Sequence, residues 1–231
     1  FRANDIQERA SAYTRLKRED PMPKTYTGQD IAIGFDMKRC IHARNCFLKL
    51  PQVFDPDRRP WVDPDAAPAE EIAAMIRTCP SGALTFTRAD APERAPGINR
   101  LAICENGPNA LHGHLSVKSE EMTRATLCRC GKSKNMPFCD YSHVEAGFEA
   151  TGEPPATGKD APGDEPGETL EIIQCENGPL EARGALEITS GTGHRLHRGT
   201  RAFLCRCGAS KNKPFCDGSH KTIGFEAPGD E

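Results

Sequence analysis

The sequence has no apolar run that approaches the roughly 18 residues of a membrane span, so we expect none. Large apolar side chains are also scarce, since 37% of the 231 residues are hydrophobic and only 6% are aromatic. This composition argues against one large core and favours small units held together by metal. The formal net charge is only −3 at pH 7, so the sequence indicates no nucleic-acid partner.

Cysteine, in contrast, is abundant. The 11 Cys are an odd number and cannot all pair in disulfides, and several stand in Cys-x-Cys or Cys-Pro contexts. Such thiols are typical of metal ligands in a reducing compartment, so we expect a cytoplasmic protein. No charged and then apolar leader is visible, although the first residue is Phe, which leaves open a native start further upstream.

The most informative feature is a cysteine-rich stretch that occurs twice. Residues 205–220 read CRCGASKNKPFCDGSH, and residues 128–143 read CRCGKSKNMPFCDYSH. Each copy has the spacing C-x-C-x8-C-x3-H, which supplies three thiols and one imidazole, a complete set of four metal ligands. Soft thiolates with one nitrogen suit iron–sulfur clusters or zinc and disfavour hard cations.

Local spacing predicts how one copy folds. Cys216 and His220 are four residues apart, so on a helix they share one face. Asp217 stands where an N-cap residue belongs, and Gly208 and Pro214 indicate a loop before it. We therefore expect a loop carrying Cys-x-Cys that folds back onto the first turn of a short helix.

This pattern resembles the CDGSH iron–sulfur family of the mitoNEET type, whose motif is C-x-C-x2-(S/T)-x3-P-x-C-D-G-(S/A/T)-H. Residues 207–220 match it at every defined position, and residues 130–143 depart once, with Tyr141 in place of Gly. The alternative is two structural zinc sites with the same ligands. The resemblance implies two [2Fe–2S] clusters, one held by Cys128, Cys130, Cys139 and His143 and the other by Cys205, Cys207, Cys216 and His220.

A third set of cysteines precedes these motifs. Cys40 and Cys46 are the outer two positions of a ferredoxin-type C-x2-C-x2-C loop whose middle position is Ala43, and Cys79 follows in a remote Cys-Pro pair. We expect a strand over 31–35, a helix over 68–78 and a strand over 84–87. Roughly residues 30–88 resemble the divergent single-cluster ferredoxin domain, which implies that Cys40, Cys46 and Cys79 are cluster ligands.

Three thiolates fit a [3Fe–4S] cluster, because Ala43 cannot bind a fourth iron. The alternative is a [4Fe–4S] cluster with His42 or an outside ligand on the fourth iron. We favour the three-iron cluster, since His42 is one residue out of register and is better explained as a surface or hydrogen-bonding imidazole. Buried thiols without a metal are the remaining interpretation, but they do not explain the Cys-Pro pair that follows a helix.

The cysteine-rich stretches belong to a longer internal repeat. Cys104-Glu-Asn-Gly-Pro recurs from Cys175 onward, and further matches join residues 123–128 to 200–205 and residues 147–150 to 224–227. Proteins of the mitoNEET type form homodimers through a β-rich cap, so the resemblance implies that dimer fused on one chain. Cys104 and Cys175 are either small buried strand residues, which we favour, or an extra ligand or redox thiol.

Basic residues flank both cysteine-rich stretches. One interpretation is that they form a solvated rim. The other is that they raise the reduction potentials of the clusters or help an acidic partner to dock. The residues are Arg129, Lys132, Lys134, Arg206, Lys211 and Lys213.

We therefore expect an α+β protein, a small ferredoxin-like α+β module followed by two β-rich CDGSH units fused as a monomeric pseudo-dimer. The expected parts are a helical extension (1–29), the ferredoxin-like domain (30–92), a first repeat (101–150), a Pro/Gly/Asp-rich linker (151–168) and a second repeat (169–231).

The function we expect is that of a soluble iron–sulfur protein that exchanges single electrons with a redox partner protein. The alternatives are storage and transfer of labile [2Fe–2S] clusters to apo-protein acceptors, and redox or pH sensing through the His ligands. Nothing in the sequence resembles a substrate pocket with an acid, a base or a nucleophile, so we do not expect an enzyme.

Overall fold

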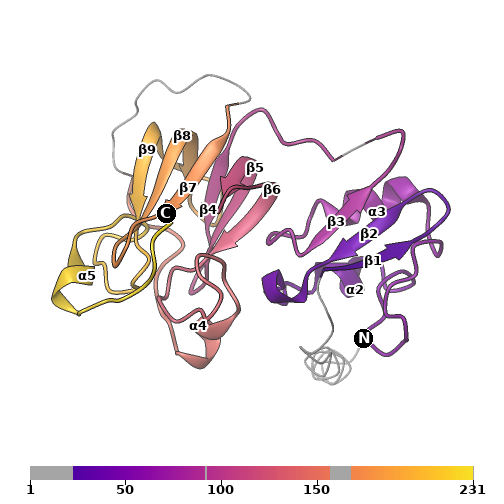
Figure 1. Ribbon diagram of the computed structural model, residues 1–231, viewed down its shortest axis with the longest axis horizontal. Helices are drawn as coiled ribbons and strands as arrows, with labels where there is room; N and C mark the ends of the chain where they lie inside the picture. The colour runs from indigo at the N-terminus through magenta and orange to yellow at the C-terminus, as the bar shows by residue number, and fades with distance from the viewer. Residues whose placement is uncertain (1–22, 92, 157–167, 231) are drawn as a thin grey trace. The chain divides into compact units, whose positions relative to one another are not determined.

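The computed structural model describes residues 23–91, 93–156 and 168–230, and it divides into two compact units (Figure 1). The first comprises residues up to 93 without 80–82, and the second comprises 80–82 together with the chain from residue 94 onward. Both units combine strands with short helices, and sheet predominates, so the expected α+β class is confirmed. Most of the helical extension expected at residues 1–29 lies outside the described residues, but residues 24–27 form a strand and not a helix.

The first unit is a three-stranded antiparallel sheet with short helices. The sheet has the order β1 (Lys24–Thr27), β2 (Ala32–Phe35) and β3 (Leu84–Thr87), and α3 (Ala69–Ile76) lies between the last two strands in the chain. These elements confirm the strands expected at 31–35 and 84–87 and the helix expected at 68–78. A single-turn 3-10 helix, η1 (Met37–Arg39), and α2 (Asn45–Lys49) carry the segment with the first two cysteines.

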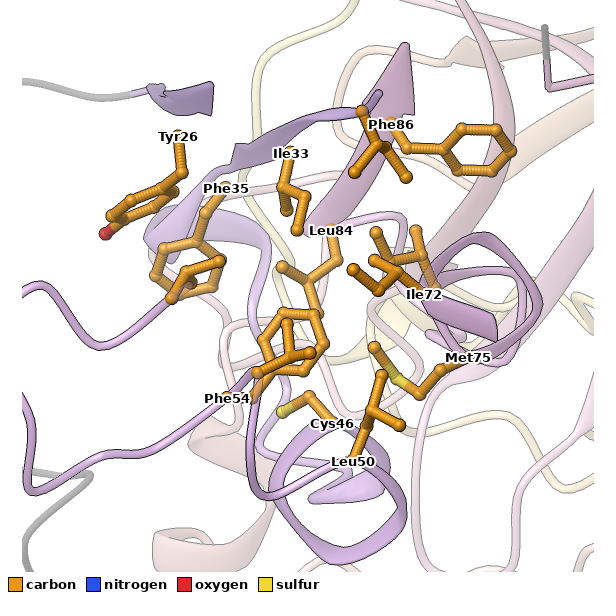
Figure 2. Packing of buried hydrophobic residues seen from close by; sticks show 14 of the residues in the cluster. Tyr26, Ile33, Phe35, Cys46, Leu50, Phe54, Ile72, Met75, Leu84 and Phe86 are labelled. Atoms are coloured by element: carbon orange, nitrogen blue, oxygen red, sulfur yellow. The ribbon is translucent and has the colours of Figure 1, made fainter. Parts of the chain in front are cut away.

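The core of this unit is built by alternating strand residues and by the apolar face of α3. Ile33 and Phe35 point inward from β2, and Ile72 and Ile76 are fully buried on α3. Figure 2 shows Cys46 among these apolar side chains, close to Leu50 and Phe54. One of the expected cluster ligands is therefore part of the hydrophobic core.

The second unit contains both repeats in one six-stranded sheet. The first repeat contributes β4 (Arg100–Ile103), β5 (Asn109–Val117) and β6 (Glu120–Leu127), and the second contributes β7 (Leu170–Gln174), β8 (Leu180–Thr189) and β9 (Arg195–Leu204). Within each repeat the three strands form an antiparallel meander. One-turn helices follow, α4 (Ser142–Glu145) and α5 (Ser219–Thr222), and both lie at the same end of this sheet (Figure 1).

The two repeats exchange strand pairings. Strand β4 pairs in parallel with β8, and β7 pairs in parallel with β5, so the first strand of each repeat joins the second strand of the other. Each second strand has an irregularity near its middle, after His112 in β5 and after Arg183 in β8. On one edge, the half before it pairs with the first strand of its own repeat and the half after it with the first strand of the other repeat. On the other edge, both halves pair with the last strand of their own repeat.

The shared sheet encloses one core drawn from both repeats. Leu101, Leu115, Leu170 and Ile188 are fully buried in the same apolar cluster. At the bend in β5, Gly113 leaves room for Asn99, since a Cβ at this glycine would lie 2.2 Å from the Asn99 side-chain oxygen. The repeats are thus one packed body in the described residues.

Candidate metal centre

Each cysteine-rich loop starts where the last strand of its repeat ends. In the first repeat β6 ends directly before Cys128, whose N–H donates to the Pro137 carbonyl (2.7 Å). The N–H of Cys139 donates to the Thr126 carbonyl (2.8 Å), so the Cys-x-Cys segment and the third cysteine lie side by side. The second repeat has the same two bonds, from Cys205 to Pro214 and from Cys216 to Phe203, at 2.8 Å each.

The four expected ligands of the first repeat lie in two pairs. The Sγ atoms of Cys128 and Cys130 are 3.7 Å apart, and Sγ of Cys139 lies 3.4 Å from Nδ1 of His143. Burial, with a smaller contribution from charge on Cys128, raises the pKa of the Cys139 thiol to about 12. Since only a thiolate binds metal, loading this site must release protons.

A shared proton links the two thiols of the first Cys-x-Cys. The hydrogen bond between them lowers the pKa of Cys128 to about 6 and raises that of Cys130. The N–H of Lys132 also points at the Cys130 sulfur (3.4 Å), and a backbone donor of this kind favours a negatively charged sulfur. The loop therefore holds the two sulfur atoms as one coupled pair.

The second repeat has the same arrangement. The Sγ atoms of Cys205 and Cys207 are 3.9 Å apart, and Sγ of Cys216 lies 3.4 Å from Nδ1 of His220. Burial raises the pKa of the Cys205 thiol to about 11. The N–H of Gly218 points at the Cys216 sulfur (3.4 Å). The structure thus forms the same two ligand pairs in both repeats.

A serine hydroxyl and an aspartate carboxylate hold each loop in shape. Ser133 donates its hydroxyl to the Phe138 carbonyl (2.6 Å) and accepts from the N–H of Asn135 (3.0 Å). The carboxylate of Asp140 accepts from the N–H groups of Lys134 (2.9 Å) and Ser142 (3.1 Å), so it joins the loop to the following helix. Ser210 and Asp217 make the equivalent bonds in the second repeat.

Two expectations about the short helix need correction. The N-cap of α5 is Gly218, and Asp217 lies one residue before it, although its carboxylate still accepts from the N–H of Ser219 (3.0 Å). The hydroxyl of Ser219 also donates to Asp217 and lowers the pKa of that carboxyl. Of the two ligands Cys216 and His220, only His220 lies in the helix, because Cys216 comes before the N-cap residue Gly218. The turn at Gly218, and not a shared helix face, brings the two ligands together.

Tyr141 occupies the position of Gly218 in the first repeat. Its backbone takes the same left-handed conformation, with φ 75° against 87° for Gly218. A side chain makes this conformation costly, by about 1–2 kcal/mol. The turn is nevertheless preserved, so the substitution leaves the geometry of the Cys139–His143 pair unchanged.

Arg129 and Arg206, the central residues of the two Cys-x-Cys segments, are both 1% exposed. A solvated rim is therefore the wrong interpretation for these two residues. The guanidinium of Arg129 donates to four carbonyls, at distances of 2.6–3.0 Å, and that of Arg206 donates to the carbonyls of Cys175 (3.1 Å) and Pro228 (2.7 Å). A signal was present in the sequence, since an Arg between two ligands must lie close to the metal.

The repeated Cys-Glu-Asn-Gly-Pro segment acts mainly through its backbone. The N–H of Asn106 donates to the Ala150 carbonyl (3.0 Å), and the Asn106 side chain accepts from the N–H of Ala150 (2.9 Å). The carbonyl of Cys104 accepts from Arg129 (2.6 Å). This turn ties the segment after the cluster loop to the buried arginine, and Asn177 and Cys175 do the same in the second repeat. Both cysteines follow their strands and are half-buried.

In the first unit, the three cysteines come from three separate helical ends. Cys40 follows η1, Cys46 lies in the first turn of α2, and Cys79 follows α3. Burial, together with charge on Cys40 and on Cys79, raises the pKa of Cys46 to about 12, so the three thiols share one electrostatic environment. The side chain of Asn45 donates to the Thr78 carbonyl (2.8 Å) and ties the two segments together.

No three His, Cys, Asp or Glu side chains of the described residues converge on a point that could hold a single metal ion. No helix in that part of the chain is long and apolar enough to cross a membrane.

Comparison with known proteins supports both resemblances. Residues 26–89 match the family model described as a divergent 4Fe-4S mono-cluster, and residues 106–144 and 177–221 match the model described as an iron-binding zinc finger of CDGSH type. The N-terminal part is similar to the uncharacterized protein YjdI of Escherichia coli K12 and to its counterpart in strain O157:H7. Each is 36% identical over 63 residues, which are 27% of this chain and 83% of the relative.

Proposed function

Because the chain belongs to the CDGSH iron–sulfur family, we propose that it transfers single electrons. It carries a divergent 4Fe-4S single-cluster domain before its two CDGSH segments. The electrons pass among its clusters and to or from a redox partner protein. The protein acts as a carrier without catalytic chemistry of its own. All of its 11 cysteines lie in the described residues and none is paired in a disulfide, which supports a reducing compartment such as the cytoplasm.

Each CDGSH segment is proposed to hold a [2Fe–2S] cluster through its three cysteines and one histidine. A tetrahedral metal with bonds of about 2.3 Å to sulfur holds two sulfur ligands about 3.8 Å apart. The Cys-x-Cys sulfur atoms lie 3.7 and 3.9 Å apart, which suits two ligands on one iron. The Cys–His pairs, at 3.4 Å, suit the second iron. The bound cluster would supply a centre that accepts and releases one electron.

The N-terminal cluster is proposed to be [3Fe–4S], held by Cys40, Cys46 and Cys79. These are the three cysteines of the first unit, and they match three irons with one thiolate each. The family description names a 4Fe-4S cluster, so the alternative is a four-iron cluster completed by His42 or by a ligand from outside the unit. In either case the domain is proposed to be ferredoxin-like.

The two repeats are proposed to be a fused dimer with an approximate two-fold axis. The support is the exchange of pairings, since β4 joins β8 just as β7 joins β5. A protein built in this way completes both sites within one chain, so we propose that it acts as a monomer.

The observation that carries electron transfer is the direct contact between the two cysteine-rich loops. A Cβ at Gly131 would lie 2.4 Å from the carbonyl oxygen of Cys207, and a Cβ at Gly208 would lie 2.3 Å from that of Cys130. A ligand of each proposed cluster is thus a backbone neighbour of the other loop. Electron exchange between two centres requires such proximity, whereas delivery of a cluster to an acceptor requires an exposed and separable site.

Anaerobic iron and sulfide analysis with EPR tests the cluster content. About seven irons per chain are expected for two two-iron clusters and one three-iron cluster, or about eight for a four-iron N-terminal cluster. The three-iron form is expected to give an EPR signal as isolated, whereas oxidised two-iron clusters are silent. A colourless protein with stoichiometric zinc would end the iron–sulfur proposal.

Reduction kinetics then test the role. A reductase with a suitable one-electron donor is expected to reduce the clusters and leave the iron content unchanged. If the clusters instead pass to an apo-ferredoxin faster than they are reduced, cluster delivery replaces electron transfer as the function.

A further inference from the structure

The two cysteine-rich loops meet at a pair of glycines, both with positive φ. Gly131 (φ 74°) packs on the backbone of Cys207, and Gly208 (φ 82°) packs on that of Cys130. No side chain fits at either position. Because the contact is backbone on backbone, the two ligand sets lie closer together than any intervening side chain would allow.

Two buried cations accompany this contact. The guanidinium groups of Arg129 and Arg206 are bound by backbone carbonyls, and neither residue has a carboxylate within ion-pair distance among the described residues. Carbonyls satisfy the N–H donors but do not cancel the charge. The Nε of Arg206 has no acceptor in the described part of the chain. A buried positive charge of this kind is costly unless an anion lies close to it.

Each of these cations lies close to the contact between the repeats. Arg129 lies between Cys128 and Cys130, and the next residue, Gly131, packs on the backbone of Cys207 in the second repeat. Arg206 lies between Cys205 and Cys207, and Gly208 packs on the backbone of Cys130 in the first repeat. Burial lowers the pKa of both guanidiniums, and charge on Glu105 near Arg129 and on Asp230 near Arg206 opposes this. The ligands of both proposed clusters therefore lie within the electrostatic reach of both guanidiniums.

We propose that Arg129 and Arg206 form a shared pair of buried counter-charges that raises the reduction potentials of both CDGSH clusters, each guanidinium acting on the cluster of the other repeat as well as on its own. This inference rests on the proposed [2Fe–2S] clusters.

The physical reason is charge balance. By formal charge counting, three thiolates and a neutral His give an oxidised [2Fe–2S] site a charge of minus one, and one electron from a reduced partner protein makes it minus two. The reaction breaks and forms no bond and only adds negative charge. A nearby permanent cation stabilises the reduced state more than the oxidised state. The effect is strong here because the guanidiniums are withdrawn from water, where solvent and salt would weaken it.

The test is a potentiometric titration of the loaded protein followed by EPR. Arg206→Met is expected to lower both midpoint potentials, by about 59 mV or more, which corresponds to a tenfold smaller equilibrium constant for one-electron reduction. His220→Cys, which adds a thiolate to the second site alone, identifies the wave of that site. Arg129→Met is expected to act in the same way on both waves.

Two variants separate charge from structure. Arg206→Lys keeps the charge and is expected to keep most of the potential, so a fall as large as that of Arg206→Met would overturn the proposal. Lys211→Met removes an exposed cation from the same loop and is expected to change the potentials far less. If Arg206→Met lowers the midpoint potential of the second site only, the proposed effect of each arginine on the cluster of the other repeat is wrong.

A measurement on the wild type keeps the proposal testable if the buried variants fail to fold. Raising the salt concentration from about 0.01 M to about 1 M screens the exposed lysines but not the buried guanidiniums. Nearly constant potentials are expected, whereas a fall of both waves by about 59 mV or more would assign the effect to the exposed lysines. Without iron–sulfur clusters no wave exists and the proposed function fails. Normal clusters with unshifted potentials in the Met variants overturn this inference alone.

Discussion

The ring of Tyr141 stands edge-on to the imidazole of His143, with ring centroids 5.1 Å apart and planes at 73°. The second repeat has no such ring, because Gly218 takes the place of Tyr141. A tyrosine ring thus contacts a proposed ligand in the first repeat only. The two CDGSH sites are nearly identical in ligand geometry but differ in how the histidine is shielded.

This shielding predicts that the first site loses its cluster more slowly in mild acid. Tyr141→Gly is expected to speed the slow phase of absorbance decay, since water and protons reach His143 more easily. The fold is expected to stay intact, because the glycine removes left-handed strain worth about 1–2 kcal/mol. Gly218→Tyr is the reciprocal variant and is expected to slow decay at the second site. An unchanged slow phase in Tyr141→Gly would contradict the shielding.

The asparagine of the Cys-Glu-Asn-Gly-Pro turn is expected to stabilise the fold. Asn106→Ala removes the hydrogen bond from the N–H of Ala150 and places an alanine at φ 48°, a left-handed conformation that alanine adopts less readily than asparagine. The two effects together are expected to lower the free energy of unfolding by about 2 kcal/mol. Asn106→Gly keeps the backbone conformation and is expected to lose only about 1 kcal/mol. Urea unfolding measures both. Equal losses would show that the hydrogen bond alone matters.

The contact between the two loops predicts an intolerant glycine. Gly131→Ala brings a Cβ to 2.4 Å from the Cys207 carbonyl at φ 74°, and it is expected to cost about 3 kcal/mol or more and to loosen both clusters. Gly147→Ala is the matched control, because its φ is 57° but nothing lies within 4 Å of the new Cβ. It is expected to cost about 1 kcal/mol. Urea unfolding and visible absorbance distinguish them, and equal losses would argue against the contact.

Acid stability is expected to depend on the histidines. Burial lowers the pKa of His143 below its usual 6.5, although Asp140 opposes this, so the ring is neutral and ready to bind metal at pH 7. The unfolded chain takes up its proton first, and the stability of the metal-free fold therefore falls as pH drops below about 6.5. In the loaded protein a proton competes with iron for the ligating nitrogen, with an effect of up to about tenfold per pH unit.

Replacing a histidine by cysteine tests this competition. His143→Cys and His220→Cys are each expected to slow absorbance decay at mildly acidic pH and to lower the potential of the altered site, because a thiolate replaces a neutral ring. If neither variant decays more slowly than the wild type, protonation of the histidine does not control cluster loss.

The exchange of strands predicts how half of the second unit behaves alone. A fragment of residues 168–231 loses the partners of β7 and β8 in the first repeat, so it exposes two strand edges and half of the shared core. It is expected to form a homodimer or to be unstable, as measured by light scattering after gel filtration. A folded, cluster-loaded monomer would show that the repeats are independent.

The sequence by itself determined the candidate ligands and the short elements next to them. Thiols and imidazoles within a short stretch of chain can reach one site almost irrespective of the rest of the fold, so the spacing of Cys205, Cys207, Cys216 and His220 already limits the chemistry. The strands expected at 31–35 and 84–87 are also present as β2 and β3, and their burial alternates as the side chains of a strand point to opposite faces in turn.

Only the tertiary structure decided what lies between the two sites. Strand pairing between residues far apart in the chain is set by the packing of the whole unit, and no local pattern shows that β4 joins β8. The same packing buries Arg129 and Arg206, which composition alone leaves as ordinary surface charges, and brings Gly131 onto Cys207. Local spacing determines which atoms can bind a metal, whereas long-range packing determines which charges surround it.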